Sequence, residues 1–273
     1  MEKKKVLFIS QEISPFLPKS SISATARSLA QGVQEAGKEI RVFMPRFGVI
    51  NERRHQLHEV IRLSGMNLII DDMDHPLIIK VASISAARMQ VYFIDNDEYF
   101  RRKSTLIEDD GSEHTDNDER SMFFCRGVLE TVKKLGWQPD VIHCNGWMTA
   151  LMPLYIKKIY KDDPHFAGTK VVYNMYDEGF NNNWDARLAE KLKFDGFKEE
   201  VTNDLADTSF GNISSVITKY VDGLSVGSED LRPELRAVFD AAECEKLDFV
   251  AEEHQVKAVS EFLDKVIEAE VLI

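Results

Sequence analysis

The feature that most constrains the fold is a short, continuously apolar run followed by an amphipathic helix and a second apolar run. Residues 6–10 are rich in strand-forming side chains without polar alternation, which is typical of a strand buried on both faces of a parallel sheet. Apolar residues then recur at helical spacing over residues 22–36, where Ser23 can cap the helix start and Gly37 suits its end. Residues 40–44 supply the second strand. This order predicts a parallel crossover.

The same alternation continues to residue 240. Helical patterns cover residues 123–135 and begin again at Thr149, which leaves Pro153 in a first helical turn. The further strands that the apolar runs predict are residues 60–63, 77–84, 89–94, 141–144, 170–174 and 224–226, of which the first three favour a meander. The fold class is therefore α/β, a Rossmann-like doubly wound parallel sheet whose ligands lie outside the carboxyl ends of the strands.

The C-terminal segment differs in composition. From residue 240 onward the chain carries ten acidic residues and three lysines. A helical stripe of apolar residues consists of Val256, Val259, Phe262, Leu263, Val266 and Ile267. We therefore divide the chain into a domain over residues 1–240 and an acidic amphipathic helix over residues 241–273, which packs on that domain or on a second copy of the chain.

Charge and cysteine content exclude several classes of partner. The formal net charge of −12 repels phosphate backbones and anionic lipid headgroups, so neither nucleic acid nor a membrane is expected as a partner. Three widely separated cysteines fit reduced thiols better than a disulfide framework. The apolar run after the basic N-terminus is too short for a signal peptide, which makes the cytoplasm the expected compartment.

Two segments bear a loose likeness to metal sites. The acidic stretch over residues 108–119 has its glycine misplaced for a calcium-binding loop, so a surface loop is expected there. The pair His55 and His58 has the wrong order for a zinc signature and lacks a third ligand. Neither a metal nor another cofactor is predicted.

Several ordered motifs resemble the start of bacterial glycogen and starch synthases. Residues 5–16, KVLFISQEISPF, are similar to the first strand of those enzymes, and residues 41–48, RVFMPRFG, are similar to the next. Residues 116–120, 135–143 and 147–155 continue the match in the same order. The likeness extends over roughly residues 1–240, which makes a chance similarity unsatisfactory as an explanation.

The resemblance implies one half of a two-domain, GT-B-type glycosyltransferase. That family transfers glucose from ADP-glucose to an α-1,4-glucan with retention of configuration, in a cleft between two Rossmann-like domains. These 273 residues correspond to the N-terminal half, whereas most groups that hold the nucleotide sugar come from the second half.

Three family loops depart from the pattern. The family loop KTGGLGD, which brings a lysine and bare amides to the nucleotide phosphates, aligns with residues 18–24, PKSSISA, so Lys19 is the candidate replacement for its lysine. The signature HAHDWHT becomes residues 143–149, HCNGWMT, and a Thr-Ile-His-Asn strand end becomes residues 171–174 with Asn174 retained. The resemblance assigns no catalytic residue, and its substrate-binding candidates are Lys19, His143, Asn145, Trp147, Thr149, Asn174 and Asp177.

Each candidate also has a purely structural interpretation. His143 can be a hydrogen-bonded residue at a strand end, Trp147 a core aromatic rather than a sugar-stacking one, and Lys19 an ordinary surface lysine. Two functions therefore stay open. One is a synthase-like protein of α-glucan biosynthesis, with weak or no transfer activity alone, that binds α-glucan or malto-oligosaccharide and ADP-glucose. The other is a non-catalytic paralogue that binds glucan or a partner protein.

Overall fold

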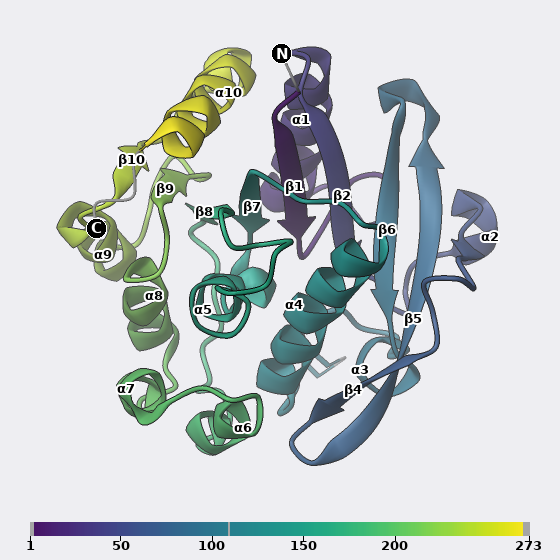
Figure 1. Ribbon diagram of the computed structural model, residues 1–273, viewed down its shortest axis with the longest axis vertical. Coiled ribbons are helices and arrows are strands. Elements are labelled where there is room, and N and C mark those ends of the chain that lie inside the picture. The colour runs from purple at the N-terminus through teal and green to yellow at the C-terminus, as the bar shows by residue number, and fades with distance from the viewer. Residues whose placement is uncertain (1–2, 109, 270–273) are drawn as a thin grey trace.

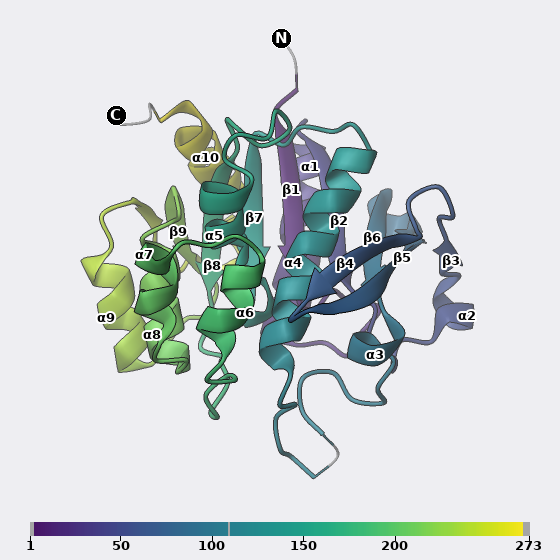
Figure 2. The same cartoon turned by 60° about the horizontal axis from the view of Figure 1, so that its bottom comes forward.

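A computed structural model describes residues 3–108 and 110–269 and shows one mixed sheet covered by helices on both faces (Figures 1 and 2). The strands are β1 (Lys5–Ser10), β2 (Glu39–Pro45), β3 (His58–Glu59), β4 (Met66–Ile70), β5 (Met73–Ile84), β6 (Met89–Asp95), β7 (Val141–Asn145), β8 (Lys170–Met175), β9 (Gly223–Val226) and β10 (Glu245–Leu247). The helices are α1 (Ser21–Glu35), α2 (Glu52–His55), α3 (Asp97–Phe100), α4 (Asn117–Lys134), α5 (Met152–Leu154), α6 (Leu188–Phe194), α7 (Glu199–Thr202), α8 (Phe210–Thr218), α9 (Pro233–Ala241) and α10 (Glu252–Glu268).

The sheet order is β10-β9-β8-β7-β1-β2-β6-β5-β3, with β4 paired to β5 outside this path. All pairs from β10 to β6 are parallel, and β3, β4 and β6 each pair antiparallel with β5. The doubly wound parallel sheet predicted from the sequence is confirmed, and so is the meander that flanks it. In Figure 1 the carboxyl ends of the parallel strands point toward the bottom of the view.

The central strands are buried on both faces because helices cover each side. Along β1 every residue from Val6 to Ser10 is buried, and all of β7 is buried. Helix α1 contacts β1 and β2, while α4 contacts β2 and β6 and runs across the front of the sheet in Figure 2. This two-sided burial explains why the strands read as continuous apolar runs rather than alternating ones.

Three local expectations are wrong. Ser20 and not Ser23 is the N-cap of α1; Ser23 lies three residues later and completes a capping box with it. Residues 60–63 form a turn, and the strand follows it as β4, in which the polar Asn67 interrupts the apolar run. Thr149 ends a short 3-10 turn instead of beginning a helix, and its hydroxyl donates to the Gly146 carbonyl at 2.7 Å.

The C-terminal helix α10 buries its apolar stripe against α1 and β8 of the same chain. Gly32 on α1 permits this close approach, since a Cβ there would lie 2.3 Å from Val256 Cγ1. Strand β10, which precedes α10, adds to the edge of the sheet beside β9. Residues 270–273 of the expected helical segment, Asp109 of the acidic loop and residues 1–2 lie outside the described residues. Among those described, no helix combines the length and apolar character needed to cross a membrane.

Candidate functional site

The candidate site lies where the order of strands reverses, between β1 and β7. The chain leaves β1 toward β2 on one side and later returns to β7 on the other, so the loops after β1 and β7 diverge at the carboxyl edge. Such a switch point is where ligands bind in open α/β sheets. Here the side chain of Gln11 fills it: its Oε1 accepts from the Met148 amide at 3.3 Å.

Gly146 makes this filling possible. Its φ of 83° lies in the left-handed region, and a Cβ at this position would lie 2.4 Å from the Gln11 side chain. A residue other than glycine would therefore be strained and would collide with Gln11. Where the family signature has an acidic residue, this chain has Gly146, and the missing side chain leaves the room that Gln11 occupies.

Three of the predicted site residues meet in a buried polar network at the ends of β7 and β8. Asn145 Nδ2 donates to His143 Nδ1 at 2.9 Å, and Asn145 Oδ1 accepts from Asn174 Nδ2 and from the Tyr176 hydroxyl, both at 3.1 Å. Asn174 Oδ1 in turn accepts from the Ser225 hydroxyl on β9 at 2.8 Å. The side chains that the sequence suggests for a ligand instead bond one another and connect three strands, β7, β8 and β9.

His143 is fully buried against Phe8, with ring centroids 5.3 Å apart. Because Nδ1 accepts from Asn145, the ring proton is placed on Nε2, which has no hydrogen-bond partner among the described residues. Burial lowers the pKa of His143 to about 3. The ring therefore stays neutral near pH 7 and does not supply a proton donor with a matched pKa.

A pH-dependent loss of stability should follow from this histidine. Its folded pKa of about 3 lies below the ordinary 6.5, so the unfolded chain binds the extra proton first and stability falls as the pH drops below about 6.5. Between pH 7.5 and 5.0 we expect His143 to account for a loss of about 2 kcal/mol in the free energy of unfolding. Urea unfolding of the wild type and of His143→Gln at both pH values measures it. A variant with the same pH dependence as the wild type would rule out this contribution.

The two other buried candidates lie under the loop after β7. Trp147 is 4% exposed and packs against Phe180 and Trp184, at centroid distances of 5.5 and 6.0 Å. Thr149 is fully buried. Among the described residues, the hollow between this loop and the end of β8, lined in part by Gly146 and Trp147, has a volume of only about 10 Å³, too small for a sugar ring.

Lys19 and Asp177 are the exposed members of the predicted set. Asp177 Oδ1 accepts from the backbone amide of Arg232 at 2.8 Å and from its Nε at 3.2 Å, which ties the loop after β8 to the start of α9. Lys19 borders a hollow of about 580 Å³ at the start of α1, which Ser228 and Phe249 also line. The structure thus separates the set into five buried residues and two exposed ones.

Two carboxylates at the start of α1 were not among the predicted site residues. The Ser20 hydroxyl donates to Glu12, and the Ser21 hydroxyl donates to Glu178 Oε1 at 3.3 Å. Burial and repulsion from Glu12 raise the pKa of Glu178. Both carboxylates therefore lie beside the N-terminus of α1, the end of a helix that favours negative charge. In the sequence Glu12 follows β1 directly and Glu178 follows shortly after β8, and this position after a strand is the signal that could have identified both acids.

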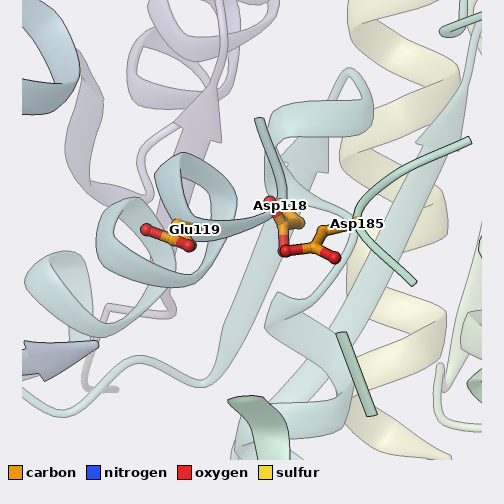
Figure 3. Close-up of side chains that lie close together, drawn as sticks. All are labelled: Asp118, Glu119 and Asp185. Carbon is orange, nitrogen blue, oxygen red and sulfur yellow. The ribbon is translucent and has the colours of Figure 1, made fainter. Parts of the chain in front are cut away.

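A second acidic group consists of Asp118, Glu119 and Asp185 (Figure 3), and these three residues surround a buried lysine. Lys191 Nζ lies 2.8 Å from Asp118, 2.7 Å from Glu119 and 2.7 Å from Asp185. These three carboxylates are close enough to ligate a metal ion, but the ammonium group of Lys191 already occupies the position between them. Burial alone would lower the pKa of Lys191, but the hydrogen bonds that its ammonium donates to the three acids raise this pKa. Lys191 therefore stays positively charged near pH 7.

Comparison with known proteins gives a consistent family signal. Residues 5–247 match the protein family described as the starch synthase catalytic domain. The glycogen synthase of Pelodictyon phaeoclathratiforme is 34% identical over 259 residues, which cover 93% of this chain and 51% of that protein. The glycogen synthase of Chlorobium limicola is 38% identical over 179 residues, which cover 64% of this chain and 37% of that protein.

Among solved structures, the chain is similar to the catalytic domain of starch synthase IV from Arabidopsis thaliana bound to ADP and acarbose. The TM-score is 0.71 at 16% sequence identity, with 91% of this chain and 52% of that chain covered. At this identity the likeness concerns the fold. The chain spans about half or less of the length of these curated relatives.

Proposed function

The chain belongs to the starch synthase catalytic domain family, and from that membership we propose that it acts in α-glucan biosynthesis with little or no glucosyl transfer of its own. Residues 1–240 would form the synthase-like domain, on which the C-terminal helix packs. The free state of Cys125, Cys144 and Cys244 supports a cytoplasmic location.

The observation that carries the proposal is the pair of carboxylates at the start of α1. A nucleotide diphosphate needs hydrogen-bond donors and positive charge at that position. Here the hydroxyls of Ser20 and Ser21 donate to Glu12 and Glu178, which bring negative charge instead. Binding of ADP-glucose would require both acids to move or to be protonated. Weak binding of ADP-glucose is therefore the expected behaviour.

The second proposed ligand is a glucan. The Arabidopsis starch synthase was solved with acarbose, a carbohydrate, as well as with ADP. We assign Lys19 and Asp177, which are exposed at the carboxyl edge, as the residues that contact an α-glucan. His143, Asn145, Trp147, Thr149 and Asn174 would position the loops beneath without touching the sugar, because they are buried.

Calorimetric titration with maltoheptaose tests the glucan assignment. Lys19→Ala and Asp177→Ala should each weaken binding several-fold, because each removes a charged hydrogen-bonding group from the edge. Lys161→Ala, an exposed lysine that borders none of these loops, should bind like the wild type. Unchanged affinity in both test variants would place the glucan elsewhere, and no binding by the wild type would refute the assignment.

A second candidate function is that of a non-catalytic glucan- or partner-binding paralogue. The specific observation in its favour is that His143, Asn145 and Asn174 use their hydrogen-bonding groups on one another. Weak but measurable binding of ADP-glucose together with glucan would favour the first function, and glucan binding without any binding of ADP-glucose would favour the second.

A further inference from the structure

A second hollow lies at the opposite edge of the sheet from the candidate site, at the amino ends of β1, β2 and β6. Its volume is about 420 Å³, within the range of small-molecule sites. It is lined by Lys3, Gln34, Lys38, Glu39, Ile40, Arg41, Arg88, Met89, Gln90 and Tyr92. These residues come from the N-terminal segment, the end of α1, the start of β2 and the turn into β6, so only the folded chain brings them together.

The charge of this hollow is opposite to that of the whole chain. Four cations and one acid line it, although the chain carries a net charge of −12. Among the residues that the structure describes, Lys38 is the one cation of the four with a close acidic partner beyond the lining, Asp264 on α10 at 2.9 Å. Gathering like charges costs free energy unless an anion offsets them. The hollow therefore has the electrostatic character of an anion site.

Arg41 is held in place with donor capacity to spare. Its guanidinium lies 5.3 Å from the ring centroid of Trp137, and its Nη2 is 3.4 Å from Glu39 Oε1. Nη1 donates to the Ile40 carbonyl, but Nε is buried and has no hydrogen-bond partner among the described residues. The Arg41 side chain as a whole is 35% exposed, and an oriented, accessible guanidinium suits the oxygens of a phosphoryl group.

The two remaining cations that line the hollow are Lys3 and Arg88. Within residues 3–108 and 110–269, neither Lys3 nor the guanidinium of Arg88 has a hydrogen-bond or ion-pair partner. The backbone at Arg88 adopts a left-handed φ of 49°, and its carbonyl accepts from Gln34 Nε2 at 3.2 Å. That bond fixes the turn from which the Arg88 side chain extends.

We propose that this hollow binds a small anion that carries a phosphoryl group. Arg41 and Arg88 would contact its oxygens, and Lys3 and Lys38 would add positive charge. The Tyr92 ring, stacked on Phe43 at a centroid distance of 5.0 Å, offers a flat surface for a sugar attached to the phosphate. The site lies apart from Lys19 and Asp177, so its occupation is independent of the proposed glucan contacts.

Calorimetric titration of the full chain at physiological ionic strength tests the proposal. The probes are inorganic pyrophosphate and glucose 1-phosphate, with glucose as the uncharged control. We expect at least one phosphorylated probe to bind, and we expect Arg88→Gln and Arg41→Gln to weaken it about tenfold or more. Arg101→Gln, an exposed arginine outside the hollow, should bind like the wild type. Tighter binding of glucose 1-phosphate that is lost in Tyr92→Ala would identify a phosphorylated sugar, whereas binding of pyrophosphate alone would identify an inorganic anion.

Two results would overturn the proposal. One is the absence of heat with both phosphorylated probes, and the other is equal weakening in Arg101→Gln and Arg88→Gln, which would indicate nonspecific attraction. Arg88 is exposed and its side chain has no described partner, so Arg88→Gln should fold normally and keep the test decisive. Thermal unfolding of each variant checks this.

Discussion

Replacement of Lys191 by methionine should lower the free energy of unfolding by about 3–5 kcal/mol. The Lys191 side chain is 2% exposed, and its ammonium group is the counter-charge for Asp118, Glu119 and Asp185, which would be left facing one another. The same cluster joins the start of α4 to α6, so its loss should loosen two segments at the carboxyl edge. Urea unfolding at pH 8 measures the difference.

The matched control for this experiment lies two residues away. Lys193 on the same helix pairs with Glu199 at 3.2 Å but is exposed, so Lys193→Met should cost less than about 1 kcal/mol. Burial raises the pKa of Asp118 to about 6 even beside Lys191. The cost of Lys191→Met should therefore shrink toward pH 5, where Asp118 can take up a proton in the variant. A deficit as small as that of Lys193→Met would show that the cluster is not stabilised by its lysine.

Incorporation of labelled glucose from ADP-glucose into glycogen by the purified 273-residue chain should stay at background. Preorganised electrostatic groups in active sites commonly contribute factors of about 100 to 1000 each. Here the start of α1 presents Glu12 and Glu178 instead of positive charge, and His143 is buried and neutral. A glycogen synthase assayed in parallel supplies the positive control. Sustained incorporation by this chain alone would refute the proposed lack of transfer.

The effect of the two carboxylates can be measured separately from transfer. The double variant Glu12→Gln and Glu178→Gln should bind ADP about tenfold or more tightly than the wild type, because it removes two negative charges from the helix N-terminus. Glu35→Gln, at the opposite end of α1, is the control and should leave ADP binding unchanged. Equal ADP affinity in the wild type and the double variant would mean that these acids do not exclude the nucleotide.

The central strands of the sheet could be predicted because the signal for each strand lies within its own residues. Each buried parallel strand must be apolar on both faces, so residues 6–10, 141–144 and 170–174 are recognisable without knowledge of their neighbours. Helical periodicity located α1, α4 and α10 in the same way. The pattern does not reveal β4 because the polar Asn67 interrupts its short apolar run. It misplaces the cap of α1 because Ser20 and Ser23 both suit that role.

The order of the motifs along the chain likewise indicated the family, since it needs only the sequence. Which charged residues meet at the carboxyl edge was decided by the tertiary structure. Glu12 and Glu178 come together through the pairing of β1, β7 and β8, although more than half of the chain separates them. Lys191 reaches Asp118 only because α6 folds against the start of α4. Whether a polar residue faces a ligand or another residue depends on such long-range packing, which leaves no periodic trace in the sequence.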